Sequence, residues 1–215
     1  MASLGRIPEA TVARLPLYLR GLDAFPVGVT ATVSSDELAD LAGVNAAKVR
    51  KDLSHLGTYG TRGVGYDATF LRFQISQALG VANVWPVVVC GMGNLGRALA
   101  NHTGFTDRGF PVVAATDSDP DKIGTVVDGV PVHAPGELGD IVRRLGVAIG
   151  VISTPAEAAQ GTADALVAAG VTSIMSFAPT VLSAPDEIEI RSVDLATELQ
   201  ILGFHLHRDR IAGDS

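Results

Sequence analysis

The chain has 215 residues, of which 47% are hydrophobic and 18% charged, and a formal net charge of −7. A chain of this length is expected to form two domains, and this composition excludes a disordered polypeptide. We expect a cytosolic protein, because no apolar stretch approaches the roughly 20 residues that span a bilayer and residues 1–10 lack the hydrophobic segment of a signal peptide. Cys90 is the only cysteine, which excludes intramolecular disulfides, and the five histidines show no metal-ligand spacing.

The negative charge lies in the C-terminal part of the chain. Residues 1–84 contain eight Lys/Arg and seven Asp/Glu, whereas residues 85–215 contain eight and sixteen. Within the first part, residues 44–63 contain four basic residues and a single acid, Asp52. Because basic clusters attract the phosphates of nucleic acids, this segment is a candidate DNA contact.

Three helices are predicted ahead of residue 57. Residues 8–22 carry an apolar stripe of helical spacing, and Pro16 is expected to kink or fray the first turns. The next helix begins at Ser34, whose spacing to Glu37 fits a capping box, and it ends at Gly43.

The third helix covers residues 46–56 and has Asn45 as its N-cap. We expect its apolar side chains to face inward and its polar ones, Asp52 among them, to face solvent. Two short helices joined by a glycine-containing turn form a helix-turn-helix, and the glycine-rich residues 58–66 suit a β-hairpin wing. The pattern predicts a winged helix that binds DNA, with a winged helix that docks on protein as the alternative. We expect DNA contacts from Asn45, Lys48, Arg50, Lys51, Ser54, Arg62 and Gly63.

A helix over residues 68–79, capped by Asp67 and ended by Gly80, is predicted to join two domains. We therefore divide the chain into a winged-helix domain with its linker helix at residues 1–84, a second domain at residues 85–193 and a C-terminal helix at residues 194–215.

The second domain opens with the pattern of a dinucleotide site. A strand-length apolar run, residues 87–90, leads into G-x-G-x-x-G at residues 91–96. The three glycines allow, in chain order, the tight turn, the approach of a pyrophosphate to the backbone, and close packing of helix on strand. Asp117, 21 residues after the last glycine, ends a second apolar run, and its carboxylate can accept hydrogen bonds from ribose hydroxyls and would repel a 2′-phosphate. The sequence predicts a Rossmann domain that prefers NAD to NADP.

The remaining pattern alternates as a doubly wound α/β sheet should. Strands are predicted at residues 130–133, 147–152 and 171–177, and helices at 137–145 and 156–169. Ligands in such sheets bind beyond the carboxyl ends of the strands. We expect the cofactor, NADH or NAD+, to contact Gly91, Met92, Gly93, Asn94, Leu95, Gly96, Asp117, Thr154, Pro155, Phe177 and Pro179.

The last predicted helix begins at Asp194 and is apolar on two faces. Leu195, Leu199, Leu202 and Leu206 share one face, and other apolar residues lie on a second. A helix with two apolar faces needs two partners, so a homodimer is predicted.

The chain carries six stretches that are typical of one protein family, at residues 7–15, 51–54, 57–66, 91–105, 177–179 and 193–195. They resemble the Rex family of bacterial redox-sensing transcriptional repressors, and the resemblance covers essentially the whole chain. It implies a homodimer whose winged helices bind a palindromic operator. It also implies that the Rossmann domains bind NADH, which releases the DNA, and that the C-terminal helix is swapped between subunits. The resemblance also implies that Arg14, His102 and Asp194 take part in sensing. His102 stands where the family commonly has Tyr, and Ser176 where it has Asn; the histidine would make sensing dependent on pH.

Two other functions, a dehydrogenase and a coenzyme A-binding protein, are alternatives to a regulator. An NAD-dependent dehydrogenase needs a proton donor or base near the nicotinamide, yet none of the three tyrosines has a Lys four residues on. After Phe177 only about 40 residues remain, too few for an independent substrate domain. A coenzyme A site on the same fold is disfavoured by the charge of Asp117. We therefore expect a regulator and no enzyme.

Overall fold

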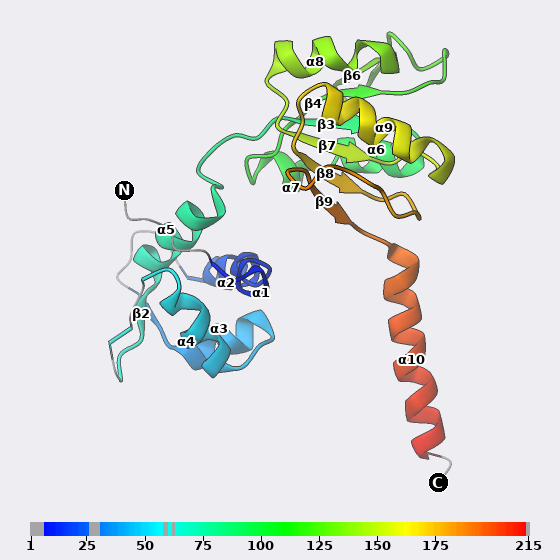
Figure 1. Cartoon of the computed structure of the whole chain (residues 1–215). Coiled ribbons are helices and arrows are strands. Elements are labelled where there is room, and N and C mark those ends of the chain that lie inside the picture. Colours follow the sequence, from blue (N-terminus) through cyan, green and yellow to red (C-terminus); the bar gives the residue numbers. More distant parts are fainter. Residues whose placement is uncertain (1–6, 26–30, 58–59, 62, 214–215) are drawn as a thin grey trace. The chain divides into compact units, whose positions relative to one another are not determined.

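The computed structural model describes residues 7–25, 31–57, 60–61 and 63–213. The chain divides into two compact units, Met1–Asn83 and Val84–Ser215 (Figure 1). Each unit has its own hydrophobic core.

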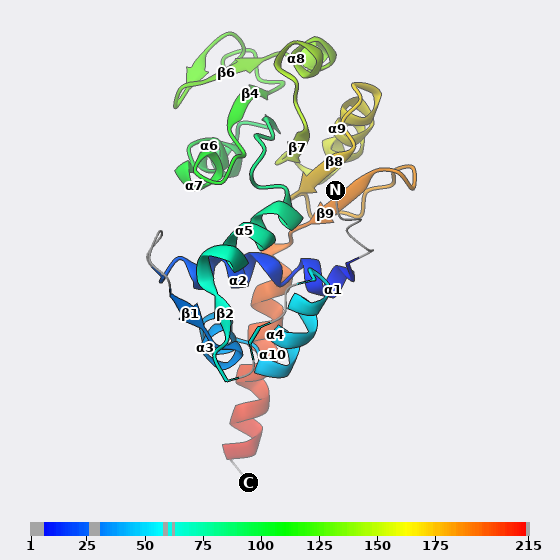
Figure 2. The same cartoon turned by 90° about the vertical axis from the view of Figure 1, so that its left-hand side faces the viewer.

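The first unit is a helical cluster with a two-stranded antiparallel sheet (Figure 2). Short-range hydrogen bonds define its helix ends. Ser34 and Glu37 form the predicted capping box, and the Asn45 side chain accepts from the Lys48 N–H at 2.9 Å. Asp67 accepts from the Phe70 N–H at 2.7 Å. The elements are α1 (Glu9–Val12), α2 (Leu15–Leu22), β1 (Thr32–Val33), α3 (Ser35–Ala42), α4 (Ala46–Ser54), β2 (Tyr66–Asp67) and α5 (Ala68–Leu79).

The expected first helix is divided into α1 and α2. The division falls ahead of Pro16, which lies in the first turn of α2. Proline has no N–H and its ring crowds the carbonyl four residues earlier, which here belongs to Val12, the last residue of α1. The predicted disruption is therefore confirmed, as a break between two helices.

Two other expectations about this unit are wrong. The third helix ends at Ser54 and not at Leu56, and Asp52 is buried, at 1% exposure, where a solvent-facing position was expected. Of the predicted wing, the structure shows an antiparallel bridge between Thr61 and Gly65. Residues 58, 59 and 62 lie outside the described residues.

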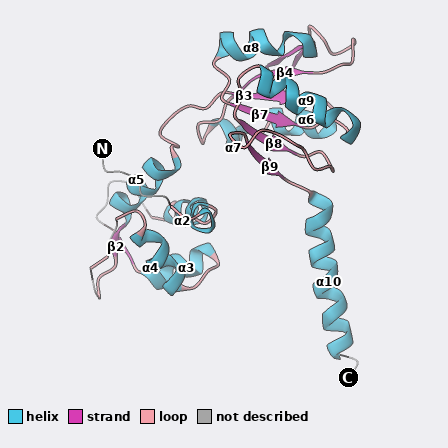
Figure 3. Cartoon of the chain, in the orientation of Figure 1, coloured by secondary structure: helices cyan, strands magenta, loops and turns pink. Residues whose placement is uncertain are grey.

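The second unit is a seven-stranded sheet with helices on both faces (Figures 2 and 3). The strand order is β5-β6-β4-β3-β7-β8-β9, and every pairing except that of β5 with β6 is parallel. Without β5 this is the doubly wound Rossmann order, whose direction of winding reverses between β3 and β7. The strands are β3 (Val87–Cys90), β4 (Val112–Thr116), β5 (Val126–Val127), β6 (Val130–His133), β7 (Ile149–Ile152), β8 (Ser173–Ser176) and β9 (Glu189–Ser192).

Two apolar clusters bury the faces of this sheet. One joins the sheet to side chains of α8 and α9, and the other joins it to Leu99 and Ala100 at the end of α6. The helices are α6 (Asn94–Ala100), α7 (Thr103–Thr106), α8 (Leu138–Leu145), preceded by the 3-10 turn η1 (Pro135–Glu137), α9 (Ala156–Ala168) and α10 (Leu195–Gly213). The predicted α/β fold class is thus confirmed.

Helix α10 differs from the other helices of this unit in its exposure. Asp194 accepts hydrogen bonds from the N–H groups of Ala196 and Thr197, at 2.9 and 3.4 Å, as the predicted N-cap should. No helix in the described part of the chain combines the length and apolar character needed to cross a membrane. The large apolar side chains of α10 are 48–69% exposed, namely Leu195, Leu199, Ile201, Leu202, Phe204 and Leu206.

Candidate functional site

The glycine-rich turn after β3 has the backbone that a dinucleotide loop requires. Gly91 has φ +97°, a left-handed conformation that L side chains rarely adopt. A Cβ on Gly96 would lie 1.8 Å from the carbonyl oxygen of Gly91, so this position admits only glycine. A Cβ on Gly93 would meet nothing within 4 Å, which leaves the backbone open there. The predicted tight turn and close helix-strand packing are both confirmed.

Asp117 follows β4 and is bound to this turn. One carboxylate oxygen, Oδ2, accepts from the Met92 N–H at 2.6 Å and from Lys122 Nζ at 3.2 Å, and Oδ1 accepts from the Asp119 N–H at 2.8 Å. Burial alone would raise the pKa of Asp117, but these three donors outweigh it and lower the pKa below its ordinary value. The group is therefore a carboxylate at neutral pH, and the partner Lys122 was not anticipated from the sequence.

A cavity of about 740 Å³ lies at the carboxyl ends of β3, β4 and β7. Its volume is within the usual range for sites that hold a small molecule or cofactor, roughly 300–1,000 Å³. Thr154 contributes a buried hydroxyl that has no hydrogen-bond partner among the described residues. Such a group is available to a ligand hydroxyl or phosphate oxygen. The lining is Cys90, Gly91, Gly93, Thr116, Asp117, Ser118, Lys122, Pro135, Leu138, Ser153, Thr154, Pro155, Ala158, Gly161, Thr162 and Ala165.

The expected cofactor contacts divide between this cavity and its surroundings. Met92 is fully buried and reaches the site through its backbone N–H. Phe177 is half-buried against the core cluster that contains Met92. Gly91, Gly93, Asp117, Thr154 and Pro155 line the cavity, whereas Met92, Asn94, Leu95, Gly96, Phe177 and Pro179 do not.

The cavity lining contains one thiol, that of Cys90. Burial raises the pKa of Cys90 to about 11, so it is a neutral thiol at physiological pH, as expected for a packed cysteine. Within the described ranges, no three His, Cys, Asp or Glu side chains lie close enough together to hold a metal ion.

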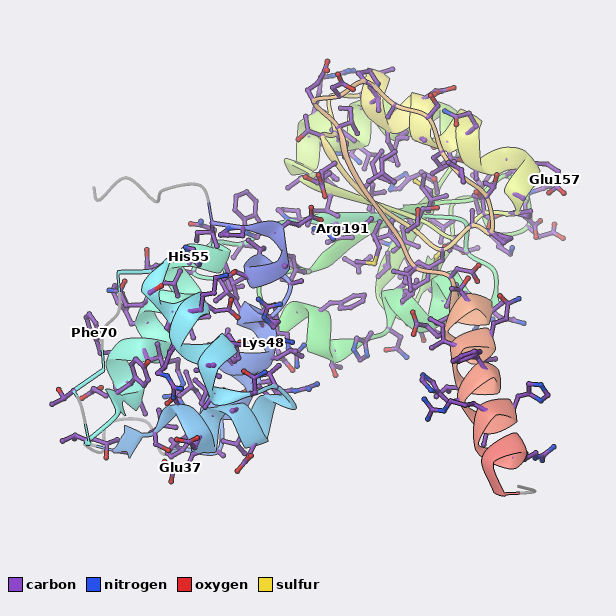
Figure 4. All side chains as sticks on the ribbon, turned by 60° about the horizontal axis from the view of Figure 1, so that its bottom comes forward. Glu37, Lys48, His55, Phe70, Glu157 and Arg191 are labelled. Atoms are coloured by element: carbon purple, nitrogen blue, oxygen red, sulfur yellow. The ribbon has the colours of Figure 1, made fainter. Side chains whose placement is uncertain are left out.

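The second candidate surface is the exposed face of α4 in the first unit. Lys48, Lys51 and His55 are exposed there, and Figure 4 shows Lys48 and His55 on this part of the molecule. Arg50 donates from Nη1 to Ser35 Oγ at 2.9 Å, which connects α4 to the start of α3. Ser54 donates to the carbonyl oxygen of Lys51 at 2.7 Å.

Two other predicted DNA contacts are also exposed. Asn45 is exposed at the start of α4, and Gly63 is exposed with φ +79°. Arg62 lies outside the described residues. The exposed basic side chains on a helix that follows a tight turn match the recognition helix of a helix-turn-helix.

Of the three predicted sensing residues, Arg14 belongs to the first unit, and His102 and Asp194 belong to the second. Arg14 binds Asp52 in the first unit, with Nε 2.6 Å from Oδ2. His102 is exposed ahead of α7 and packs edge-on against Phe105, with ring centroids 4.8 Å apart. Asp194 caps α10.

The chain combines a helix-turn-helix unit with a Rossmann unit that has a cavity where the winding of its sheet reverses. This combination defines a DNA-binding protein regulated by a nucleotide. The family model "CoA binding domain" matches residues 82–180, and "Putative DNA-binding protein N-terminus" matches residues 6–54. A redox-sensing transcriptional repressor Rex from Streptomyces avermitilis is 61% identical over 94% of this chain and 80% of its own length. That from Carboxydothermus hydrogenoformans is 46% identical over 95% and 98%.

Solved structures agree with these relatives. The crystal structure of RSP in complex with beta-NAD+ and operator DNA matches 98% of this chain and 97% of its own, with a TM-score of 0.89 and 31% identity. RSP in complex with beta-NADH matches 98% and 99%, with a TM-score of 0.85 and 30% identity. The chain belongs to the Rex family of redox-sensing transcriptional repressors.

Proposed function

We propose that this protein binds operator DNA when NADH is scarce and releases it when NADH binds. The observation that carries the proposal is the hydrogen bond that joins Asp117 to the glycine turn, in the lining of the cavity, in a chain that also presents a basic recognition helix. The related RSP structures with NAD+ and operator DNA and with NADH support it.

The residues present fit a dinucleotide. A carboxylate has about four lone-pair positions, and Asp117 uses three of them, so one remains on Oδ1 for a ribose hydroxyl. The open backbone at Gly93 suits a pyrophosphate, and the unpartnered Thr154 hydroxyl suits the distal half of the ligand. The whole proposed contact set is Gly91, Met92, Gly93, Asn94, Leu95, Gly96, Asp117, Thr154, Pro155, Phe177 and Pro179.

Discrimination between the two redox forms has to arise at the nicotinamide, because the adenosine halves are chemically identical. The ring is cationic in NAD+ and neutral in NADH, and burying a charge costs more than burying a neutral ring. We place this end of the ligand near Phe177. A hundredfold preference requires only about 2.7 kcal/mol. NADH therefore favours the conformation in which the ring is enclosed, and we propose that this conformation does not fit the operator.

The remaining assignments come from the residues and from the family resemblance. We propose a homodimer on a palindromic operator, with residues 194–215 exchanged between subunits and Arg14, His102 and Asp194 conveying the redox state. Operator contacts come from Asn45, Lys48, Arg50, Lys51, Ser54, Arg62 and Gly63. The protein acts in the cytoplasm, and we propose that it turns over no substrate.

The test titrates a preformed complex of protein and operator with NADH, NAD+ or coenzyme A. We expect NADH to release the DNA, and NAD+ and coenzyme A to release it poorly at equal concentrations. D117A should require at least about tenfold more NADH, whereas D121A, which removes an exposed acid nearby, should behave like wild type. Equal release by NADH and NAD+ would exclude redox sensing, and unchanged release in D117A would exclude the ribose contact.

A further inference from the structure

The recognition helix α4 carries one buried carboxylate, that of Asp52, which belongs neither to the cavity nor to the exposed face of α4. Asp52 lies near the end of α4, between the exposed basic residues and the core, and its exposure is 1%. Carboxylates are almost never fully buried unless they are paired. Its partners therefore indicate what it does.

Asp52 accepts four hydrogen bonds from three side chains of α1, α2 and the turn between them. Arg14 donates from Nε to Oδ2 at 2.6 Å and from Nη2 to Oδ1 at 2.8 Å. Tyr18 donates to Oδ2 at 2.7 Å, and Thr11 donates to Oδ1 at 2.9 Å. The two acceptor oxygens are thus saturated, with a bidentate guanidinium and two hydroxyls.

These contacts stabilise the ionised form of Asp52. Burial would raise its pKa, but the hydrogen bonds from Arg14, Tyr18 and Thr11 outweigh burial and lower the pKa below its ordinary value. Burial and the contact with Asp52 raise the pKa of Tyr18 to about 12, against the opposing effect of Arg14, so this hydroxyl stays a donor. The cluster is a fixed buried network throughout the physiological pH range.

The network connects α4 to elements other than its main packing partner. Helix α4 packs chiefly on α3, and α3 on α2. The Asp52 network adds a direct polar connection from α4 to α1 and α2. Directional hydrogen bonds restrict the rotation of a helix about its axis more than apolar packing does, because they require particular distances and angles.

We propose that Asp52 is a positioning residue for operator binding, which holds α4 in the orientation that presents Lys48 and Lys51 to DNA. This inference rests on the proposed function, because it concerns the helix that would enter the operator. Asp52 itself contacts no phosphate in this proposal. Its contribution to affinity acts through the position of its neighbours on α4.

The network also gives Arg14 a direct connection to the recognition helix. The Arg14 side chain is 25% exposed, whereas Thr11 and Tyr18 are 2% and 0% exposed. Arg14 is therefore the member that another group of the protein can reach. Drawing its guanidinium away would leave a buried carboxylate without its counter-charge, which is strongly unfavourable.

The charge of Asp52 and its positioning role predict opposite effects in D52N. Removing a negative charge beside Lys51 would strengthen attraction to phosphates if only charge mattered. If Asp52 positions α4, the same substitution should weaken operator binding, because the Asn amide cannot accept all four hydrogen bonds. The sign of the change in affinity therefore separates the two roles.

The experiment measures operator affinity at several salt concentrations, at a temperature where thermal melting shows each variant to be folded. We expect D52N to bind at least about tenfold more weakly than wild type, about 1.4 kcal/mol. A single lost phosphate contact reduces the slope of log affinity against log salt concentration by roughly one unit. We expect D52N to reduce this slope by more than that, because a displaced helix loses several contacts. Its NADH affinity should be unchanged.

Two other variants complete the test. D40N removes an exposed acid of α3 and should bind the operator as wild type does or slightly better. Y18F removes one of the four hydrogen bonds and retains the packed ring, so it should give a smaller loss in the same direction as D52N, and it carries the test if D52N does not fold. Folded D52N and Y18F that bind at least as tightly as wild type would overturn the positioning role. The release of wild-type protein by NADH is a separate measurement, so it can fail or succeed independently.

Discussion

At the scale of single residues, Gly96 allows the most direct test of the nucleotide loop. In G96A the new Cβ would lie 1.8 Å from the Gly91 carbonyl oxygen, so α6 or the turn after β3 must shift. Overpacking of this kind typically costs roughly 1–3 kcal/mol. We expect a lower melting temperature and a clear loss of NADH affinity, measured by calorimetric titration of folded protein.

The matched control is G139A in α8, where the added Cβ would approach only the end of the Arg143 side chain, at 3.4 Å. Where the backbone conformation suits alanine, replacing a glycine by alanine generally stabilises a protein by about 0.4–1 kcal/mol. G139A should therefore melt at or above the temperature of wild type and bind NADH normally. A G96A protein that binds NADH as tightly as wild type would show that the loop does not need the observed close packing.

Residues whose roles depend on local backbone geometry could be predicted, and those that depend on distant partners could not. The glycines of the loop and Asp117 follow from a short motif with a steric explanation. Asp52 pairs with residues 34–41 positions away, and no local rule identifies them. A signal was nevertheless present, because Asp52 follows Val49 by three positions and so shares the buried face of α4.

At the scale of elements, α4 is the proposed DNA contact, and Lys51 tests it. K51A should weaken operator binding and reduce the slope of log affinity against log salt by about one unit, the effect of one lost phosphate contact. NADH binding should be unaffected. R144A removes the same charge from the exposed surface of α8 in the other unit and should leave both measurements unchanged. Equal salt dependence in K51A and wild type would remove α4 from the interface.

Helix starts could be predicted from the sequence for a physical reason. The caps at Ser34, Asn45, Asp67 and Asp194 satisfy N–H groups two or three residues away, so sequence neighbours determine them. Strand β9 has no such local signal, because it exists through pairing with β8. Most of the fold, but only part of the site, therefore follows from local pattern.

At the scale of the whole molecule, the exposed apolar side chains of α10 require a partner. Six large apolar side chains that are 48–69% exposed are unusual on a single helix of a soluble monomer. A second copy of this chain would bury them, in agreement with the two apolar faces seen in the sequence. A dimer also places two recognition helices at a fixed separation, which a palindromic operator requires.

Deleting residues 194–215 should therefore give a monomer or aggregates and greatly reduce operator affinity. Loss of bivalent binding commonly costs a factor of 10²–10⁴, even when each half-site contact is unchanged. The point variants L199E and L202E should have the same effect, whereas Q200E, which adds the same charge at an exposed polar position, should remain a dimer. Light scattering gives the oligomeric state, and titration with full and half operators gives the affinity. A soluble dimer after deletion would place the interface elsewhere, and full operator affinity in a monomer would show that the two half-sites are read independently.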